Sequence, residues 1–279
     1  MREIDCETIR QAVGRLCVEA NLRLPKDVCI AIDRMAEHES RPLCQTMLAQ
    51  MQKNRRVAEE TGLALCQDTG SAVVFIELGQ DVHITGGQLY AAIQDGVSQG
   101  YKEGYLRRSI VTALTRINTG DNTPAILHTE IVPGDRLTLT IVPKGGGAEN
   151  MSASAMLKPS VGVSGVVDFV VDTVRKAGAN PCPPIVVGVG IGGDFETAPL
   201  LAKRALLRTI GSRNSDPELA SLEQALLERI NALGIGVMGF GGENTALAVF
   251  VETMPCHFAS LPVAVNLNCH VARHQTLVL

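Results

Sequence analysis

The 279-residue sequence lacks the features that mark several large classes of protein. No apolar run approaches the roughly 18 to 20 residues that a membrane helix needs. The stretch Met1–Cys6 shows neither a basic segment followed by an apolar one nor a cleavage signature, so we expect a cytoplasmic protein. A net charge of -4 offers no basic face for nucleic acid. There is no internal repeat, low-complexity segment or linker.

The eight cysteines lack the spacings of familiar metal and redox motifs. No two of them form a Cys-x-x-Cys pair, which argues against a zinc ribbon, a thioredoxin-like motif and a ferredoxin. Without a secretory signal, a disulfide framework is not expected. A cytosolic cysteine usually behaves as a small buried hydrophobic residue. This interpretation suits the four that lie among expected helices, which are Cys6, Cys17, Cys29 and Cys44.

What is present is the composition of an ordinary soluble globular protein, with 46% hydrophobic and 19% charged residues. Apolar residues recur at helical spacing through residues 1–62, which predicts a layer of helices. From residue 63 onward, strand patterns near 72–78 and 185–189 alternate with helical ones. We therefore expect a mixed α/β fold. It would form a single domain over residues 1–279, with a helical layer at 1–62 and an α/β region at 63–279.

Residues 125–142 carry the pattern of a β-hairpin within a mixed sheet. Ala125–Val132 and Arg136–Val142 flank the turn Pro133-Gly134-Asp135. Apolar and polar residues alternate in Leu137–Ile141, as they do in a half-buried strand.

Two glycine-rich segments invite a ligand-binding interpretation. Lys144–Asn150 contains three consecutive glycines but no P-loop ending, and it is either a backbone nest for an anion or a flexible loop. Gly188, Gly190 and Gly193 follow a buried strand as in a dinucleotide-binding motif. No acidic residue ends a second strand about 20 residues later, so an NAD-binding enzyme is a weak alternative.

Four cysteines lie beside expected strand boundaries, and they are Cys66, Cys182, Cys256 and Cys269. Their positions do not say which of them bind a metal, and four loop cysteines can also arise by chance. Three converging thiolates would leave one iron of a 4Fe-4S cluster without a protein ligand. Such an iron is a Lewis acid suited to hydro-lyase chemistry. Four thiolates would close the cluster and favour a carrier.

Several motifs, in matching order over nearly the whole chain, resemble those of class I fumarate hydratases. The first is the cluster-binding loop Leu65-Cys66-Gln67-Asp68-Thr69-Gly70. The others are Leu106–Ser109, Asn118–Asn122, Lys144–Asn150, Cys182–Pro184, Gly239–Gly242, His257–Pro262 and Cys269-His270. The sequence looks like the α subunit, or N-terminal half, of that family. The similar L-tartrate dehydratase α subunit shares the cysteines but lacks the Lys-Gly-Gly-Gly-x-Glu-Asn form, so fumarase is favoured.

The resemblance implies a 4Fe-4S cluster and a ligand set. The ligands would be Cys66, Cys182 and Cys269, with Cys256 outside the motif. The fourth iron would then bind the substrate hydroxyl.

The resemblance also implies roles around the substrate. Gln67 and Arg107 would bind its carboxylates, with Arg108 as the alternative clamp. The backbone of Gly145, Gly146 and Gly147 would line the pocket. Asp68 would exchange a proton with the substrate hydroxyl, with His257 as its partner, although a structural histidine is the simpler interpretation of His257.

The activity implied is the reversible hydration of fumarate to malate. Alternatives are an L-tartrate dehydratase α subunit and, in another class, a non-catalytic iron–sulfur carrier. In the family, residues of a β half complete the site, and nothing after Cys269 could hold one. We therefore expect a β subunit as obligate partner, in an αβ or α2β2 enzyme, and a small dicarboxylate substrate, with neither nucleic acid nor membrane as a partner.

Overall fold

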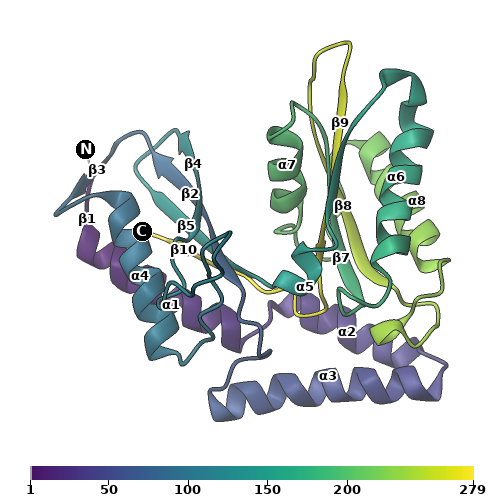
Figure 1. Ribbon diagram of the computed structural model, residues 1–279, viewed down its shortest axis with the longest axis horizontal. Helices are drawn as coiled ribbons and strands as arrows, with labels where there is room; N and C mark the ends of the chain where they lie inside the picture. The colour runs from purple at the N-terminus through teal and green to yellow at the C-terminus, as the bar shows by residue number, and fades with distance from the viewer. Residues whose placement is uncertain (1) are drawn as a thin grey trace. The chain divides into compact units, whose positions relative to one another are not determined.

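The computed structural model describes residues 2–279, which form two compact units (Figure 1). Unit 1 takes the described residues up to Pro25, then Asn54–Gly146 and Arg273–Leu279. Unit 2 takes Lys26–Lys53 and Gly147–Ala272. The mixed α/β class expected from the sequence is confirmed. That these units act as one domain stays a prediction.

The expected boundary at residue 62 does not coincide with the boundary between the units. Helix α1 (Cys6–Leu22) packs against α4 (Leu89–Glu103) within unit 1, whereas α2 (Lys26–His38) belongs to unit 2. Helix α3 (Pro42–Thr61) contains residues of both units. None of the helices in the described part of the chain is long and apolar enough to cross a membrane.

Unit 1 is built on a four-stranded sheet in the order β10-β5-β2-β4. A buried cluster of apolar side chains from α1, α4 and this sheet forms its core. A small parallel pair joins β1 and β3. The strands are β1 (Arg2–Asp5), β2 (Ser71–Gly79), β3 (Val82–Thr85), β4 (Ile126–Val132), β5 (Leu137–Lys144) and β10 (Gln275–Val278).

The predicted β-hairpin at residues 125–142 is wrong. Strands β4 and β5 exist, but β2 lies between them, parallel to β4 and antiparallel to β5. The reason is the apolar run Ala72–Ile76, which is buried throughout and needs a neighbouring strand on each side. The Pro-Gly-Asp turn therefore joins two strands that pair with β2 and not with each other.

Unit 2 is built on a second four-stranded sheet, in the order β6-β9-β7-β8. Figure 1 shows α7 on one face of this sheet and α6 and α8 on the other. The strands are β6 (Ala153–Leu157), β7 (Ile185–Gly192), β8 (Ala246–Met254) and β9 (Leu261–Asn268). The remaining helices are α5 (Gly146–Glu149), α6 (Gly162–Ala177), α7 (Thr197–Ala205) and α8 (Pro217–Asn231), with short 3-10 turns at Pro159–Val161 and Val237–Gly239.

The glycine motif of β7 has a packing role in this unit. A Cβ atom on Gly188 would lie 2.0 Å from the carbonyl oxygen of Ala202, and one on Gly190 would lie 2.1 Å from that of Ala198. Both carbonyls belong to α7. Glycine at these positions therefore lets the helix backbone rest directly on the strand, which accounts for the spacing that resembles a dinucleotide site.

Candidate functional site

The loop Cys66–Gly70 connects α3 to β2 and is held in place at both ends. At its start, the N–H of buried Leu65 donates to the Asn21 carbonyl oxygen at 2.9 Å. The Leu65 carbonyl oxygen accepts from Asn54 Nδ2 at 2.8 Å. Cys66 and Asp68 are half-buried, and the side chain of Gln67 is exposed. The loop thus presents a thiol, an amide and a carboxylate from an anchored backbone.

At its end the loop rests on two buried side chains to which sequence patterns assigned no role. The hydroxyl of Tyr101 donates to the carbonyl oxygens of Thr69 and Gly70, at 2.7 and 3.1 Å. Burial raises the pKa of Tyr101, so the hydroxyl keeps its proton and remains a donor. Asn122 donates to the Gly70 carbonyl oxygen at 3.1 Å and accepts from the Ser109 N–H at 2.6 Å. Two motifs of the sequence, at 106–109 and 118–122, therefore meet beneath this loop.

The Asp68 carboxylate joins the loop to the glycine-rich segment. Its Oδ1 atom accepts from the Gly70 N–H at 3.0 Å, and its Oδ2 atom accepts from the Gly146 N–H at 2.8 Å. A Cβ atom on Gly145 would lie 3.2 Å from Oδ2, so the absence of a side chain leaves space beside the carboxylate. The structure brings Asp68, Gly145 and Gly146 together, whereas Gly147 belongs to unit 2.

The two neighbouring arginines differ in how their backbones are held. The Arg107 carbonyl oxygen accepts from the Thr69 hydroxyl at 3.1 Å, which ties this residue to the cysteine loop. The Arg108 carbonyl oxygen instead accepts from Asn118 Nδ2 at 2.8 Å. Both side chains are exposed. Arg107 is therefore the arginine whose main chain contacts the loop.

Unit 2 holds two cysteines side by side at one end of its sheet. Cys182 precedes β7 and Cys269 follows β9, and these strands pair antiparallel with Val186 opposite Asn268. The N–H and Nδ1 of His270 lie 3.3 and 3.0 Å from the Cys182 carbonyl oxygen. Cys182 has a φ of 54°, a left-handed conformation that is uncommon for a residue other than glycine. Local backbone strain of this kind accompanies many functional sites.

The structure places Cys256 and His257 at the opposite end of this sheet, in the connection between β8 and β9. The eight residues of β9 separate them from Cys269, which is about 26 Å at the usual rise of a strand. His257 is exposed, accepts from the Ala259 N–H at 3.2 Å, and packs on Phe258 with 4.7 Å between ring centroids. Cys256 and His257 therefore do not share a site with Cys182 and Cys269 inside one chain.

The thiols supply the right chemistry for an iron–sulfur cluster. Over the described residues, neither unit alone gathers three His, Cys, Asp or Glu side chains that could hold one metal ion. Unit 1 offers the Cys66 thiol on the anchored loop, and unit 2 offers the adjacent pair. Thiolates are the ligands that such clusters prefer. The cysteines are therefore the right type of ligand for an iron–sulfur cluster. Cys182 and Cys269 also lie at the same end of one sheet, as two ligands of one cluster must.

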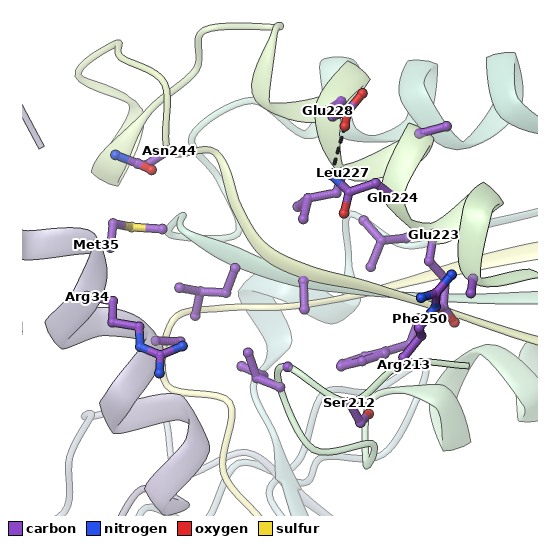
Figure 2. A pocket seen from close by; sticks show the side chains of 18 of the residues that line it. Arg34, Met35, Ser212, Arg213, Glu223, Gln224, Leu227, Glu228, Asn244 and Phe250 are labelled. Carbon is purple, nitrogen blue, oxygen red and sulfur yellow. Dashed lines mark hydrogen bonds between the residues drawn. The ribbon is translucent and has the colours of Figure 1, made fainter. Parts of the chain in front are cut away.

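Unit 2 contains a wide groove of about 980 Å³ (Figure 2). It is bounded by α2, α8, β8 and the loop at residues 210–213. Arg34 and Arg213 approach it from two sides, and Glu228 from a third. No residue predicted to take part in the site lines it. The groove is therefore not the candidate active site, despite its size.

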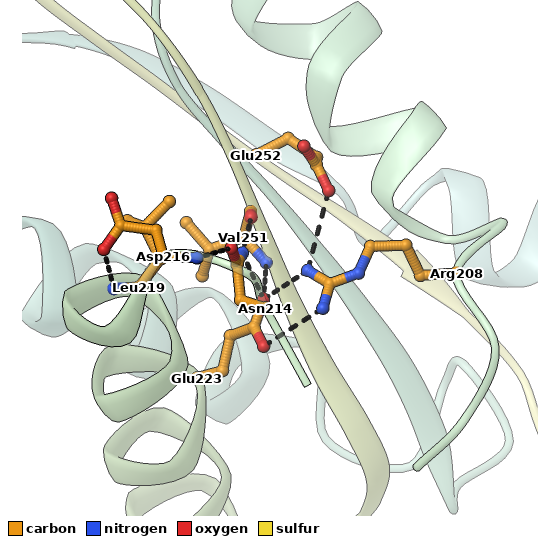
Figure 3. Close-up of polar contacts among 7 residues, drawn as sticks. All are labelled: Arg208, Asn214, Asp216, Leu219, Glu223, Val251 and Glu252. Atoms are coloured by element: carbon orange, nitrogen blue, oxygen red, sulfur yellow. Dashed lines mark hydrogen bonds and ion pairs between the residues drawn. The ribbon is translucent and has the colours of Figure 1, made fainter. Parts of the chain in front are cut away.

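Beside this groove, side chains close the free edge of β8 (Figure 3). Glu223 accepts from the Val251 N–H at 2.8 Å, and Asn214 donates to the Val251 carbonyl oxygen at 3.0 Å. Arg208 pairs with Glu223 at 2.5 Å and with Glu252 at 3.5 Å. This network satisfies backbone groups that an edge strand leaves unpaired. Its role is structural.

The sequence of the chain is similar to a known family and to several named relatives. The family model described as fumarate hydratase (Fumerase) matches residues 10–278. The chain is 45% identical over 271 residues to a "Putative L(+)-tartrate dehydratase subunit alpha" of Methanocaldococcus jannaschii, covering 95% of both chains. It is 31% identical over 275 residues to the L(+)-tartrate dehydratase subunit alpha of Escherichia coli (strain K12), covering 97% of this chain and 90% of the relative.

Proposed function

This chain belongs to the fumarate hydratase (Fumerase) family, and we propose that it is the α subunit of an iron–sulfur hydro-lyase acting on a four-carbon dicarboxylate. Family membership makes it a hydro-lyase α subunit. The observation that carries the finer proposal is the loop at Cys66–Asp68. There a thiol precedes a carboxylate that is held by two backbone N–H groups, beside a glycine-rich segment.

The cluster would take the thiolates of Cys66, Cys182 and Cys269 as its ligands. When bound, it supplies a Lewis-acidic iron that no protein side chain ligates. Cys256, at the other end of β9, has no part in this ligand set. Because Cys256 lies at the other end of β9, it is not placed to act as a fourth thiolate ligand. This argues against the alternative of a non-catalytic carrier, whose cluster would have four thiolate ligands.

Asp68 would move a proton at the substrate hydroxyl. Its two N–H donors orient the carboxylate and leave lone pairs on both oxygens for the substrate. Arg107, whose backbone contacts the loop, would bind one substrate carboxylate together with Gln67. The backbone of Gly145, Gly146 and Gly147 would line the substrate pocket. Residues larger than glycine at these positions would fill the space that the substrate needs.

We propose that His257 partners Asp68 from a second copy of the chain. The eight residues of β9 keep it about 26 Å from Cys269 of its own chain, so one chain cannot use both at one site. A partner copy would remove this constraint, and an α2β2 enzyme contains one.

Mixing two variants tests this arrangement. His257→Ala and Cys269→Ser enzymes are each expected to be nearly inactive. When the α chains are mixed during assembly, a Cys269→Ser chain supplies His257 to the intact cluster site of its neighbour, and part of the activity returns. Mixing His257→Ala with a second preparation of itself is the control. Mixed enzyme as inactive as either parent would rule out the exchange.

Two observations favour different substrates. The Lys-Gly-Gly-Gly-Ala-Glu-Asn segment favours fumarate, as the family resemblance implies, whereas the relatives are named as L(+)-tartrate dehydratase α subunits and favour L-tartrate. Loss of water from a hydroxy dicarboxylate is common to both. The same residues would serve either reaction.

The direct test uses the full chain, reconstituted anaerobically with iron and sulfide and combined with its β subunit. We expect hydration of fumarate or dehydration of L-tartrate, followed by the absorbance of fumarate or the formation of oxaloacetate. The chain without the β subunit should show little activity. A reconstituted complex that turns over neither substrate would contradict the proposed hydro-lyase activity. Full activity of the chain alone would contradict the proposal that a β subunit is required.

A further inference from the structure

Arg273 is a buried arginine beside the cysteine loop of unit 1. It lies four residues after Cys269 and just before β10, and it is 3% exposed. Its Nη2 atom donates to the carbonyl oxygen of Asp68 at 2.5 Å. The guanidinium group therefore holds the peptide that carries the proposed proton-transfer residue.

No acidic side chain in the described part of the chain forms an ion pair with this arginine. Its Nε atom is buried and has no hydrogen-bond partner, and none of the ion pairs within residues 2–279 includes Arg273. A carbonyl oxygen accepts a hydrogen bond but does not neutralise a cation. Arginine does not lose its proton in proteins. Buried charges are otherwise paired or bound to an ion of opposite sign.

The carboxylate of Asp68, whose backbone carbonyl Arg273 binds, accepts hydrogen bonds from other groups. The Asp68 oxygens accept from Gly70 and Gly146, and no ion pair joins them to Arg273 among the described residues. The charge of Arg273 reaches the Tyr101 hydroxyl, where it opposes the rise in pKa that burial causes. The positive charge thus acts at the underside of the loop that carries Cys66 and Asp68.

We propose that Arg273 is the buried counter-charge for the anion that binds at the Cys66–Thr69 loop, and that it positions Asp68 through the backbone. The inference rests on the proposed function, which supplies two anions at this loop. One is a cluster ligated by thiolates, which carries net negative charge, and the other is a substrate carboxylate. In either case the bound group completes the charge balance that the chain leaves open.

The test compares Arg273→Gln, Arg273→Lys and the control Arg15→Met in the reconstituted full chain. Gln loses the charge but keeps an N–H donor for the Asp68 carbonyl oxygen, and Lys keeps the charge. Arg15 is an exposed arginine of the same unit. Three quantities are measured: the midpoint reduction potential of the cluster, the rise in Tm that cluster binding produces, and the KM of the enzyme completed with its β subunit.

If the cluster is the anion, Arg273→Gln shifts the one-electron reduction equilibrium about tenfold toward the oxidised form, or about 59 mV. It also reduces the cluster-dependent rise in Tm, while Arg273→Lys and Arg15→Met keep wild-type values. If the substrate is the anion, the potential stays unchanged. The KM of the complete enzyme then rises at least about tenfold in the Gln variant, with a smaller change in kcat.

An Arg273→Gln chain that matches wild type in all three measurements would overturn the proposal. So would a Gln variant that lowers Tm equally with and without cluster while leaving potential and KM unchanged, because that is the signature of packing alone. If the Gln chain does not fold, Arg273→Met is measured in its place. If that chain also fails to fold, Arg273→Lys is compared with wild type. Wild-type potential, Tm rise and KM then support the role of charge, and a changed potential or KM despite the retained charge overturns it. Failure of the wild-type chain to bind a cluster would instead count against the proposed function.

Discussion

Serine in place of Cys182 or Cys269 is expected to abolish the visible iron–sulfur absorbance of the reconstituted chain, while Cys256→Ser keeps it. A serine hydroxyl is a poor ligand for iron, because it is harder than a thiolate and does not deprotonate readily at neutral pH. The two cysteines share one sheet end, and Cys256 lies at the other. The activity of the complete enzyme should follow the cluster, with both ligand variants inactive.

Cys256→Ser is a matched control because it changes a cysteine of the same unit in the same way. Far-ultraviolet circular dichroism should show that all three variants fold. The ligand assignment would be wrong if Cys256→Ser lost the cluster or if Cys269→Ser retained it at wild-type occupancy. The same measurement on Cys66→Ser tests whether unit 1 contributes to the ligand set.

The second large effect is expected at Asp68, where Asp68→Asn should lower kcat by about 10² to 10⁴ while the cluster remains bound. The amide has the shape of the carboxylate but cannot exchange a proton at neutral pH. Its NH2 group also faces one of the N–H donors of Gly70 or Gly146, which removes one of the two hydrogen bonds. Steady-state kinetics with fumarate or L-tartrate, beside the visible spectrum, separates lost chemistry from lost cofactor.

Asp135→Asn is the control for this variant, since Asp135 is an exposed turn residue of the same unit. It should leave kcat within a factor of about two, as expected for a surface change away from the site. A kcat of Asp68→Asn within about threefold of wild type would remove Asp68 from the proton transfer. The hydroxyl proton would then have to leave through another group.

The element types were largely predictable because periodicity is a local property. Helical spacing marked α1 and α2, and buried apolar runs marked β2 and β7. Pairing was less predictable. The turn between β4 and β5 looked like that of a hairpin, but β2 enters between the two strands. No local pattern in residues 125–142 reports the burial of a strand fifty residues earlier.

The candidate site divides in a similar way. The cysteine loop, Arg107 and the glycine-rich segment stand out in the sequence because polar groups and glycines interrupt apolar runs there. The support beneath the loop did not stand out: Tyr101 lies in a helix whose pattern indicates only burial. The distance between His257 and Cys269 is likewise set by the length and direction of β9 and not by their spacing in the chain.

Local spacing was enough to predict a mixed α/β fold, since helical and strand patterns depend on which residues follow one another. The resemblance of ordered motifs to a known family implied a hydro-lyase, and the thiolate ligands that it implies stay a prediction. The fold was needed to show that β7 and β9 place Cys182 and Cys269 at one end of the sheet and His257 at the opposite end. It was also needed to show that Arg273 is buried against the Asp68 loop without an ion-pair partner in the described part of the chain. Both are consequences of strand direction and burial, which arise only when distant segments pack.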